Sequence, residues 1–290
     1  MTFSILATFA ACQARATVVR FDSVLGAIDV RLFDAATPIS TQNIINYIND
    51  GDYEDNFVHR SVPGFIIQAG GFNFPEGVGV QNVPTDPPIL NEFGITNIRG
   101  TIAYAKVGPP EGQPPNPTTI NSATSGFFFN LADNASNLDN QNGGFTVFGR
   151  VVGNGMAVAD AIANLPRVNA GGAFTTLPVI DFQGGTIFRE NLALFNDISI
   201  LTNPDADYTF NGVVSNADLV VWETDFGSAL DVEADGNGSG VVDGSDFLIW
   251  QQQLVTSGAL HAATAVPEPT TLLLAALTIG LPLAVRRRRH

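Results

Sequence analysis

The fifteen residues from Phe57 to Gly71 restrict the fold of this chain more than any other segment. They read FVHRSVPGFIIQAGG, so a guanidinium, aromatic rings, an amide and several aliphatic side chains stand close together. The alternation predicts two short strands bent at Pro63-Gly64. Their two faces would carry different side chains: Val62, Phe65 and Ile67 on one, and Arg60, Ile66 and Gln68 on the other. One face would pack into a core, and the other would present Arg60 and Gln68 beside apolar side chains.

This segment resembles the active-site signature of the cyclophilins, the peptidyl-prolyl cis-trans isomerases, which reads approximately F-H-R-x-x-x-G-F-x-x-Q-x-G. It departs from that signature at Val58, where Phe is usual, and at Ala69, where Gly is usual. Three later segments are also similar to the family's sequence: Arg99–Ala105, Ser122–Asn130 and Leu138–Val151. The resemblance covers about residues 17–200. It implies a mainly β fold, a closed eight-stranded antiparallel barrel capped by two helices.

The chemistry of prolyl isomerisation explains why these residue types would serve it. The barrier of roughly 18–20 kcal/mol arises from the double-bond character of the peptide C–N bond, so lowering it requires no nucleophile, metal or redox cofactor. A donor that draws the lone pair of the prolyl nitrogen out of conjugation favours the twisted amide. Arg60 is a suitable donor because its guanidinium is planar and permanently charged. We therefore expect no cofactor for catalysis.

The family resemblance also implies roles for the site residues. Arg60 and Gln68 would be catalytic, with Gln68 binding the substrate backbone near Arg60. The residues that would bind the substrate are Phe65, Ile66, Ala105, Phe128 and Leu138. Phe127 and Phe129 would pack in the core, because neighbouring residues of a strand point to opposite faces. His59 would be a structural hydrogen-bonding residue rather than a base.

Three positions depart from the family's pattern. Gly126 stands where an amide side chain often orients the arginine, Asn137 where an aromatic ring is frequent, and Phe145 where His is frequent. We expect isomerase activity with a reduced rate or an altered peptide preference, and poor sensitivity to cyclosporin. The alternative is a non-catalytic cyclophilin-like domain that binds proline-containing peptides or serves as a matrix component.

Alternation and end signals predict the elements around the signature. Thr17–Phe21 and Ile28–Leu32 are typical of an antiparallel hairpin. Thr37-Pro38 marks the start of a helix and Gly51 its end. A second helix is expected over residues 156–165. Residues 107–124 contain five prolines and should form an irregular surface loop.

Composition limits the classes of partner. The chain has 290 residues, 45% of them hydrophobic, with 29 Gly and 17 Pro, which favours a loop-rich β protein with more than one module. The formal net charge is -15, and four of the thirteen basic residues stand together in Arg286–Arg289. Such acidity argues against nucleic acid as a partner, because binding phosphates requires a basic surface.

Between residues 204 and 258 two segments repeat with a period of 28 residues, as from Asp207 to Asp235. Oxygen-bearing side chains at positions 1, 3, 5, 9 and 12 of each loop, with Gly at 6 and an apolar residue at 8, indicate an EF-hand-like calcium loop. The candidate calcium ligands are Asp235, Asn237, Ser239, Asp243 and Asp246 in the second copy, and Asp207, Thr209, Asn211 and Asp218 in the first.

Each loop leads into a segment with apolar residues at helical spacing: Leu219, Trp222 and Phe226, then Phe247, Trp250 and Leu254. A paired repeat with a short carboxylate at position 12 resembles dockerin modules, which implies a small α-helical repeat with a protein partner. The first copy has fewer carboxylates, so its calcium binding should be weaker or absent. The alternative is a linker rich in Asp, Asn and Gly.

The N-terminal residues 1–16 resemble a secretory signal peptide. An apolar run from Phe3 to Cys12 precedes Ala14-Arg15-Ala16, although no basic residue stands before the run. The alternatives are strand sequence leading into Thr17 and lipid modification of Cys12. Cys12 is the single cysteine, so no intrachain disulfide can form.

The C-terminal residues 265–290 resemble a PEP-CTERM sorting signal. Val266-Pro267-Glu268-Pro269 precedes the apolar run Leu272–Val285 and then Arg286–Arg289. The resemblance implies a hydrophobic helix inserted at least transiently in the membrane, a sorting and processing enzyme there, and export to the bacterial envelope or the outside of the cell. A plain membrane anchor is the alternative, although a run of fourteen residues interrupted by Gly280 and Pro282 is short for spanning a bilayer, which takes about twenty apolar residues.

Overall fold

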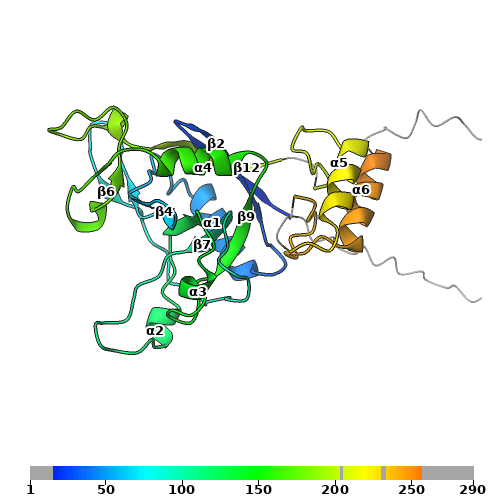
Figure 1. Cartoon of the computed structure of the whole chain (residues 1–290), viewed down its shortest axis with the longest axis horizontal. Helices are drawn as coiled ribbons and strands as arrows, with labels where there is room; N and C mark the ends of the chain where they lie inside the picture. The colour runs from blue at the N-terminus through cyan, green and yellow to red at the C-terminus, as the bar shows by residue number, and fades with distance from the viewer. Residues whose placement is uncertain (1–15, 203–204, 230–232, 257–290) are drawn as a thin grey trace, which may run out of the picture.

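The computed structural model describes residues 16–202, 205–229 and 233–256. We refer to residues 16–202 as the sheet body and to the described residues from 205 to 256 as the repeat unit (Figure 1). The main sheet is antiparallel and has the order β12-β1-β2-β9-β7-β8-β4-β3. Its strands are β1 Val18–Ser23, β2 Gly26–Leu32, β3 Arg60–Val62, β4 Ile66–Ala69, β7 Thr101–Tyr104, β8 Phe127–Asn130, β9 Val147–Val152 and β12 Phe195–Leu201.

Shorter elements surround this sheet. Two small ladders pair β5 Phe72–Asn73 with β6 Gln81–Asn82 and β10 Arg167–Val168 with β11 Leu177–Pro178. The α-helices are α1 Pro38–Asn49, α2 Pro117–Ile120, α3 Ala135–Leu138, α4 Gly155–Ala163, α5 Asn216–Asp225 and α6 Gly244–Thr256. Two 3-10 turns, η1 Gly172–Phe174 and η2 Arg189–Asn191, lie in the segment before β12.

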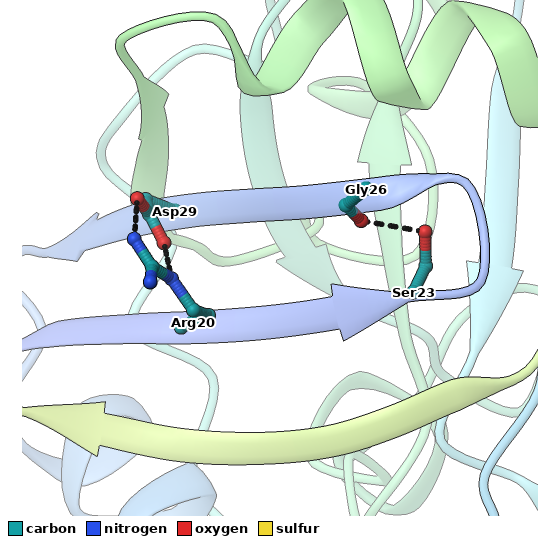
Figure 2. Close-up of polar contacts among 4 residues, drawn as sticks. All are labelled: Arg20, Ser23, Gly26 and Asp29. Carbon is teal, nitrogen blue, oxygen red and sulfur yellow. Dashed lines mark hydrogen bonds and ion pairs between the residues drawn. The ribbon is translucent and has the colours of Figure 1, made fainter.

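The first two strands form the hairpin that their alternation predicts. Within it, Arg20 lies opposite Asp29, and the guanidinium donates two hydrogen bonds of 2.7 and 2.8 Å to the carboxylate (Figure 2). At the turn, the hydroxyl of Ser23 donates to the carbonyl oxygen of Gly26 at 2.7 Å. Gly26 has φ near 125°, a conformation that side-chain-bearing residues rarely adopt. The hairpin is therefore closed at the turn by Ser23 and braced along the strands by the ion pair.

The sheet is open and curled, which corrects the predicted closed barrel. Its edge strands β12 and β3 meet only where Phe57, just before β3, bridges Leu194, just before β12. The physical reason is that β3 has only three residues and its free edge is already occupied. Ser61 donates its backbone N–H to the carbonyl oxygen of Thr176 at 2.9 Å. No continuous ladder can close across that edge.

The core of the body lies inside the curled sheet beneath α1 and α4. Pro38 begins α1 as predicted, and Gly51, with φ near 76°, follows its end. Ile44 and Tyr47 are fully buried and give α1 an apolar face toward the core. The helix predicted over residues 156–165 is shorter in the structure, where α4 spans residues 155–163. Its buried face includes Ala159 and Ile162.

The proline-rich segment 107–124 is irregular, as predicted, except for one helical turn. Asn116 caps α2 by accepting hydrogen bonds from the backbone N–H groups of Thr118 and Thr119. Residues 110–118 are exposed, and Thr119 is buried. The loop therefore returns to the body at α2 and leads from there into β8.

The repeat unit is built from two equivalent loop-helix halves. Each half begins at a buried aspartate, Asp207 or Asp235, and continues into α5 or α6. The indole N–H of Trp222 donates to the carbonyl oxygen of Asp243, and that of Trp250 to the carbonyl oxygen of Ser215, both at 2.8 Å. Because these acceptors are 28 residues apart, like the tryptophans, the two halves exchange equivalent hydrogen bonds.

A small apolar core supports this exchange. Trp222 packs on Phe247, and Phe247 stacks on Trp250, with ring centroids 5.0 and 5.6 Å apart. The predicted apolar face of α5 is only partly buried, because Phe226 is 58% exposed. The unit therefore has much less apolar interior than the sheet body.

The repeat unit is attached to the body through β2 and its flanks, at the end of the sheet where α5 and α6 lie in Figure 1. Arg31 is 1% exposed, and its Nη1 donates to the carbonyl oxygen of Asp235 at 2.7 Å. Its guanidinium also lies over the ring of Tyr208, 5.6 Å from the centroid. Gly238 packs so closely on the backbone of Asp34 and Leu32 that a Cβ there would approach within 2.9 Å.

Two predicted segments lie outside the described residues. They are residues 1–15 of the predicted signal peptide and the whole of 265–290, which includes the predicted C-terminal hydrophobic helix. Within the described ranges, none of the helices combines the length and the apolar character that crossing a bilayer requires.

Candidate active site

The register of four strands gathers the candidate site residues on one face of the sheet. Arg60 lies opposite Gln68, Gln68 opposite Phe128, and Phe128 opposite Ala103. Residues directly opposite one another in an antiparallel ladder share a face. Since neighbouring strands are about 4.8 Å apart, the Cα atoms of Arg60 and Phe128 are separated by roughly 10 Å. A guanidinium on its long stem can therefore act beside the Phe128 ring.

The opposite face belongs to the core. Phe127, Phe129 and Ile67 pack with the fully buried interior of the curled sheet. The packing expected for Phe127 and Phe129 is thus observed. The expected place of Val62 is corrected: it lies opposite Ile66 on the site face, and Ser61 faces inward instead. The tight turn at Pro63-Gly64 sets this pairing, because it places Val62 and Ile66 at matching positions of the two strands.

The candidate substrate-binding residues form one apolar cluster on the site face. Its members include Ile66, Phe128 and Leu138, which are nearly buried, and Phe65 and Ala105, which are partly exposed. The structure thus brings together all five residues that the sequence analysis named for substrate binding. Phe65 is held through its carbonyl oxygen, which accepts from the backbone N–H of Leu131 and the side-chain amide of Asn134 at 2.8 and 2.9 Å.

The two candidate catalytic side chains lie next to this cluster. Nη1 of Arg60 donates to Oε1 of Gln68 at 3.4 Å, and both side chains are partly exposed. At that distance the hydrogen bond is weak. Arg60 therefore keeps most of its donor capacity for another acceptor. Gln68 limits the directions in which the guanidinium can turn.

His59 is packed rather than hydrogen-bonded through its ring, which differs from the expectation. The residue is 5% exposed, and its ring meets Phe72 edge-on with centroids 4.9 Å apart. Its Nδ1 has no hydrogen-bond partner among the described residues. Burial, together with the charge of Arg60, lowers the pKa of His59 to about 4. A neutral ring among aromatic neighbours is the physical consequence.

The three positions that depart from the family pattern, Gly126, Asn137 and Phe145, have different surroundings in the structure. A Cβ added at Gly126 would lie 3.5 Å from the Cβ of Ala105, so the position is close to the candidate subsite. Asn137 is exposed. Phe145 packs edge-on against Phe128, with ring centroids 5.8 Å apart. An aromatic ring thus contributes apolar surface where an imidazole is frequent in relatives.

Two further groups at the site were not anticipated from the sequence. Lys106 directly follows Ala105, and its ammonium lies 5.0 Å from the ring centroid of Phe145. Asn130 links Asn97, Thr101 and Asn134 through side-chain hydrogen bonds of 2.7 to 3.1 Å. The position of Lys106 beside a named subsite residue is the signal that could have identified it.

The candidate calcium ligands fall into two equivalent sets of hydrogen bonds. In each loop the first aspartate accepts from the backbone N–H groups of positions 5 and 6: Asp207 from Asn211 and Gly212, and Asp235 from Ser239 and Gly240. The last aspartate accepts from positions 3 and 9: Asp218 from Thr209 and Ser215, and Asp246 from Asn237 and Asp243.

These four aspartates are at most 1% exposed. Burial raises the pKa of Asp246 to about 6, and the charge of Asp235 adds to the rise. Burial also raises the pKa of Asp235. Within the described residues, however, no group of three or more His, Cys, Asp or Glu side chains is arranged to hold a metal ion. Any ion in these loops would depend on the two buried carboxylates of each loop and on further oxygens of that loop, which include those of Asp243 in the second.

Comparison with known families identifies two parts of the chain. The family described as cyclophilin type peptidyl-prolyl cis-trans isomerase/CLD matches residues 17–181. The PEP-CTERM protein-sorting motif matches residues 265–289. Both matches agree with the resemblances in the sequence, and neither of them includes the dockerin-like repeat.

Individual relatives carry the same description. Peptidyl-prolyl cis-trans isomerase A of Dickeya dadantii is 39% identical over 150 residues, which cover 50% of this chain and 70% of that protein. A peptidyl-prolyl cis-trans isomerase of Acinetobacter baylyi is 37% identical over 158 residues, covering 53% and 76%. A crystal structure of a Cryptosporidium parvum cyclophilin type isomerase has 21% identity and a TM-score of 0.47, covering 65% of this chain and 99% of that chain.

The family match spans more than half of the chain, and it contains the strands that carry Arg60, Gln68 and Phe128. The relatives named as isomerases are 37–39% identical over 50–53% of this chain. The family match and these relatives lead to one conclusion: this chain belongs to the cyclophilin-type peptidyl-prolyl cis-trans isomerases.

Proposed function

We propose that this chain catalyses the cis-trans isomerisation of proline-containing polypeptides on the sheet face that carries Arg60. Gln68 would bind the peptide backbone beside Arg60. Phe65, Ile66, Phe128 and Leu138 would enclose the proline ring, and Ala105 would line the adjoining subsite. The observation that supports this assignment is the row of paired residues from Arg60 to Phe128, which sets a cation beside an apolar cluster.

The proposed mechanism follows from the electronic cause of the barrier. As the prolyl C–N bond rotates, the nitrogen lone pair leaves conjugation and becomes a hydrogen-bond acceptor. Arg60 would donate to that nitrogen, and the bond would be stronger in the twisted state than in either planar state. The apolar cluster excludes water, which strengthens such a charge-assisted bond. No covalent intermediate, metal or cofactor enters this sequence.

Arg60→Ala tests the assignment. A hydrogen bond from a charged donor contributes about 1.5–3 kcal/mol, so kcat/KM for a proline peptide should fall about 10- to 100-fold. Arg20→Ala is the matched control, since Arg20 is half-exposed and lies on the hairpin. Equal rates in wild type and Arg60→Ala would reject the catalytic assignment. If neither protein accelerated isomerisation above the uncatalysed rate, the chain would instead be a non-catalytic peptide-binding or matrix component on a cyclophilin fold.

We propose that the isomerase works in the bacterial envelope or outside the cell. The support is the PEP-CTERM motif over 265–289, a sorting signal by its description. A sorting and processing enzyme at the membrane would be its partner, with the C-terminal segment inserted at least transiently. Mass spectrometry of the protein recovered from cell fractions would identify both mature termini. Recovery only from the cytoplasm, with residues 1–290 intact, would reject this location.

We propose calcium binding by the repeat unit, with residues 204–258 as a domain beside the isomerase domain of residues 17–200. The equivalent hydrogen bonds of the two loops and the burial of Asp235 and Asp246 support this proposal. Calcium would lower the cost of keeping both carboxylates ionised, and alternating oxygens suit a hard cation. The second loop should bind more tightly, since Asp243 gives it a third carboxylate. A protein partner of this dockerin-like unit would then recognise its ordered form.

A calcium titration monitored by tryptophan emission tests this proposal directly. Trp222 and Trp250 are the only tryptophans of the chain and both lie in the repeat unit, so the signal reports that unit alone. Asp235→Asn should abolish the response of the second loop. Asp197→Asn, an exposed change on β12, is the charge-matched control. A flat titration in the wild type would reject calcium binding.

A further inference from the structure

Lys106 is the only lysine among the thirteen basic residues of the chain, the other twelve being arginines. It directly follows Ala105 at the end of β7, next to the candidate subsite, and it is half-buried. A lysine is seldom buried without partners, because its ammonium is strongly hydrated in water. Its surroundings therefore indicate what the charge does.

All three N–H donors of the ammonium have acceptors at hydrogen-bond distance. Nζ of Lys106 lies 2.6 Å from the carbonyl oxygen of Gly144, 2.8 Å from that of Asn142 and 3.2 Å from Oδ1 of Asn91. Above these acceptors lies the ring of Phe145, with its centroid 5.0 Å away. An ammonium has three donors, so no donor is left for a substrate.

The two carbonyl acceptors belong to a left-handed turn. Asn142, Gly143 and Gly144 have φ of 47°, 74° and 74°, three consecutive residues in the left-handed region. Glycine adopts this region readily, whereas for Asn142 it is less favourable and persists when neighbouring structure holds it. A Cβ at Gly144 would approach the Phe93 ring within 2.4 Å, so the turn is also packed closely from outside. Lys106 binds the turn from the other side.

This turn ends at Phe145, and Phe145 meets the candidate proline pocket. Its ring packs edge-on on Phe128 at 5.8 Å, and its backbone N–H donates to the carbonyl oxygen of Leu138 at 3.1 Å. Phe128 and Leu138 are both proposed substrate-binding residues. The ammonium of Lys106 is thus connected to the pocket through the turn 142–144 and the ring of Phe145.

We propose that protonated Lys106 is a positioning residue for prolyl isomerisation, which fixes the left-handed turn 142–144 and thereby holds the Phe145 ring against Phe128. This inference rests on the proposed site on the Arg60 face. It assigns to Lys106 no contact with the substrate. Loss of the charge removes one of the three donors and weakens the two that remain, which loosens the turn and lets Phe145 leave the pocket wall.

The charge of Lys106 can be removed within an accessible pH range. Burial lowers the pKa of Lys106 from its ordinary 10.5 to about 8. The ionisable side chains on the surrounding segments are Tyr104, Glu92, Glu111 and Asp139. Glu92 binds backbone N–H groups of α1, and Asp139 binds Asn97. Burial holds the pKa of Tyr104 far above its usual range. Lys106 is accordingly the group expected to change charge between pH 7 and 9.5.

The experiment uses the full chain labelled at the side-chain Cε of lysine, which gives one lysine resonance. That resonance should titrate with a midpoint near pH 8, and the backbone amide resonances of Gly143, Gly144 and Phe145 should shift with the same midpoint. Over the same range, kcat/KM for a proline peptide should fall about tenfold, which corresponds to about 1.4 kcal/mol. Lys106→Met should have the low value already at pH 7 and a flat pH profile.

Two results would overturn the proposal. The first is a wild-type kcat/KM that stays constant while the lysine resonance titrates, and this result is obtained even if Lys106→Met does not fold. The second is wild-type activity of folded Lys106→Met at pH 7. Arg60→Ala, measured alongside, separates this proposal from the site on which it rests. If that variant keeps full activity, the site is wrong, whereas the amide shifts still report whether Lys106 holds the turn.

Discussion

The sheet body and the repeat unit are stabilised by different means. The body encloses a large apolar interior in which aromatic side chains such as Phe21, Phe127 and Phe129 pack edge to face. The repeat unit has a small apolar core and four aspartates that are at most 1% exposed. Burying a carboxylate is costly unless hydrogen bonds or a cation compensate, whereas burying a phenyl ring is favourable by itself.

The comparison indicates that the stability of the two regions depends on different factors. The body can hold the candidate catalytic face rigid because many packing contacts fix the side chains of its interior. The repeat unit depends on conditions outside its own core: the ionisation state of its aspartates and its attachment to β2. The four predictions below test this contrast, from the largest expected effect to the smallest.

Phe129→Ala should destabilise the body most. Removing a buried aromatic side chain costs about 3–5 kcal/mol, through lost burial and the cavity left behind. Denaturant unfolding followed by far-ultraviolet circular dichroism measures this loss. Phe128→Ala is the variant on the opposite face; at 3% exposed it should also lose stability, and it should in addition lower activity directly. A Phe129→Ala protein as stable as wild type would contradict the view that the interior fixes the site.

Arg31→Ala should uncouple the two regions. It removes the hydrogen bond from Arg31 to the carbonyl oxygen of Asp235 and leaves a cavity at a position 1% exposed. The expected loss is about 3 kcal/mol for the repeat unit, read from tryptophan emission. Arg31→Met keeps the volume of the aliphatic part of the arginine side chain, so it should destabilise the repeat unit less than Arg31→Ala. Identical unfolding midpoints for both variants and wild type would show that the attachment contributes nothing.

Acidity should stabilise the repeat unit when calcium is removed with a chelator. The folded pKa of Asp246, about 6, lies above the unfolded value near 3.9. Its contribution is therefore complete below about pH 4 and is lost as the pH rises through about 6. We expect a loss of about 2 kcal/mol between pH 4 and pH 7 in urea unfolding followed by tryptophan emission. Asp246→Asn should make the free energy of unfolding less dependent on pH. A wild-type free energy of unfolding that does not change with pH would refute the prediction.

Arg20→Ala should have the smallest effect. The Arg20–Asp29 pair has good geometry, but the arginine side chain is 42% exposed, so solvent screens the interaction. Exposed pairs contribute about 0.2–1 kcal/mol. Unfolding at low and at 1 M salt, compared with Asp29→Ala and the double variant, isolates the pair. A loss above about 2 kcal/mol would mean that the hairpin, rather than the interior, limits the stability of the body.

Much of the fold follows from local patterns in the sequence. Ile28, Val30 and Leu32 alternate and are all fully buried, and the signals at Pro38 and Gly51 bound α1 as expected. The spacing from Arg60 to Gln68 was sufficient to place both side chains on one face, because an antiparallel hairpin allows few registers.

Other features depend on contacts that no local pattern contains. Alternation in β2 predicts an exposed Arg31, and it is buried only because the repeat unit, more than 170 residues later, covers that face. The open edge of the sheet depends on Thr176 pairing with Ser61. The role of Lys106 likewise depends on a turn 36 residues away in sequence.

The exchange of indole hydrogen bonds between Trp222 and Trp250 has a consequence for how such a unit can be divided. Each half supplies the carbonyl acceptor that the other half's indole needs. An isolated 28-residue half lacks this acceptor, so its indole would donate to water or to the equivalent carbonyl of a second copy. The geometry is that of a two-fold homodimer whose protomers have become one polypeptide, so severing the connection between the halves should convert a unimolecular folding reaction into a concentration-dependent one.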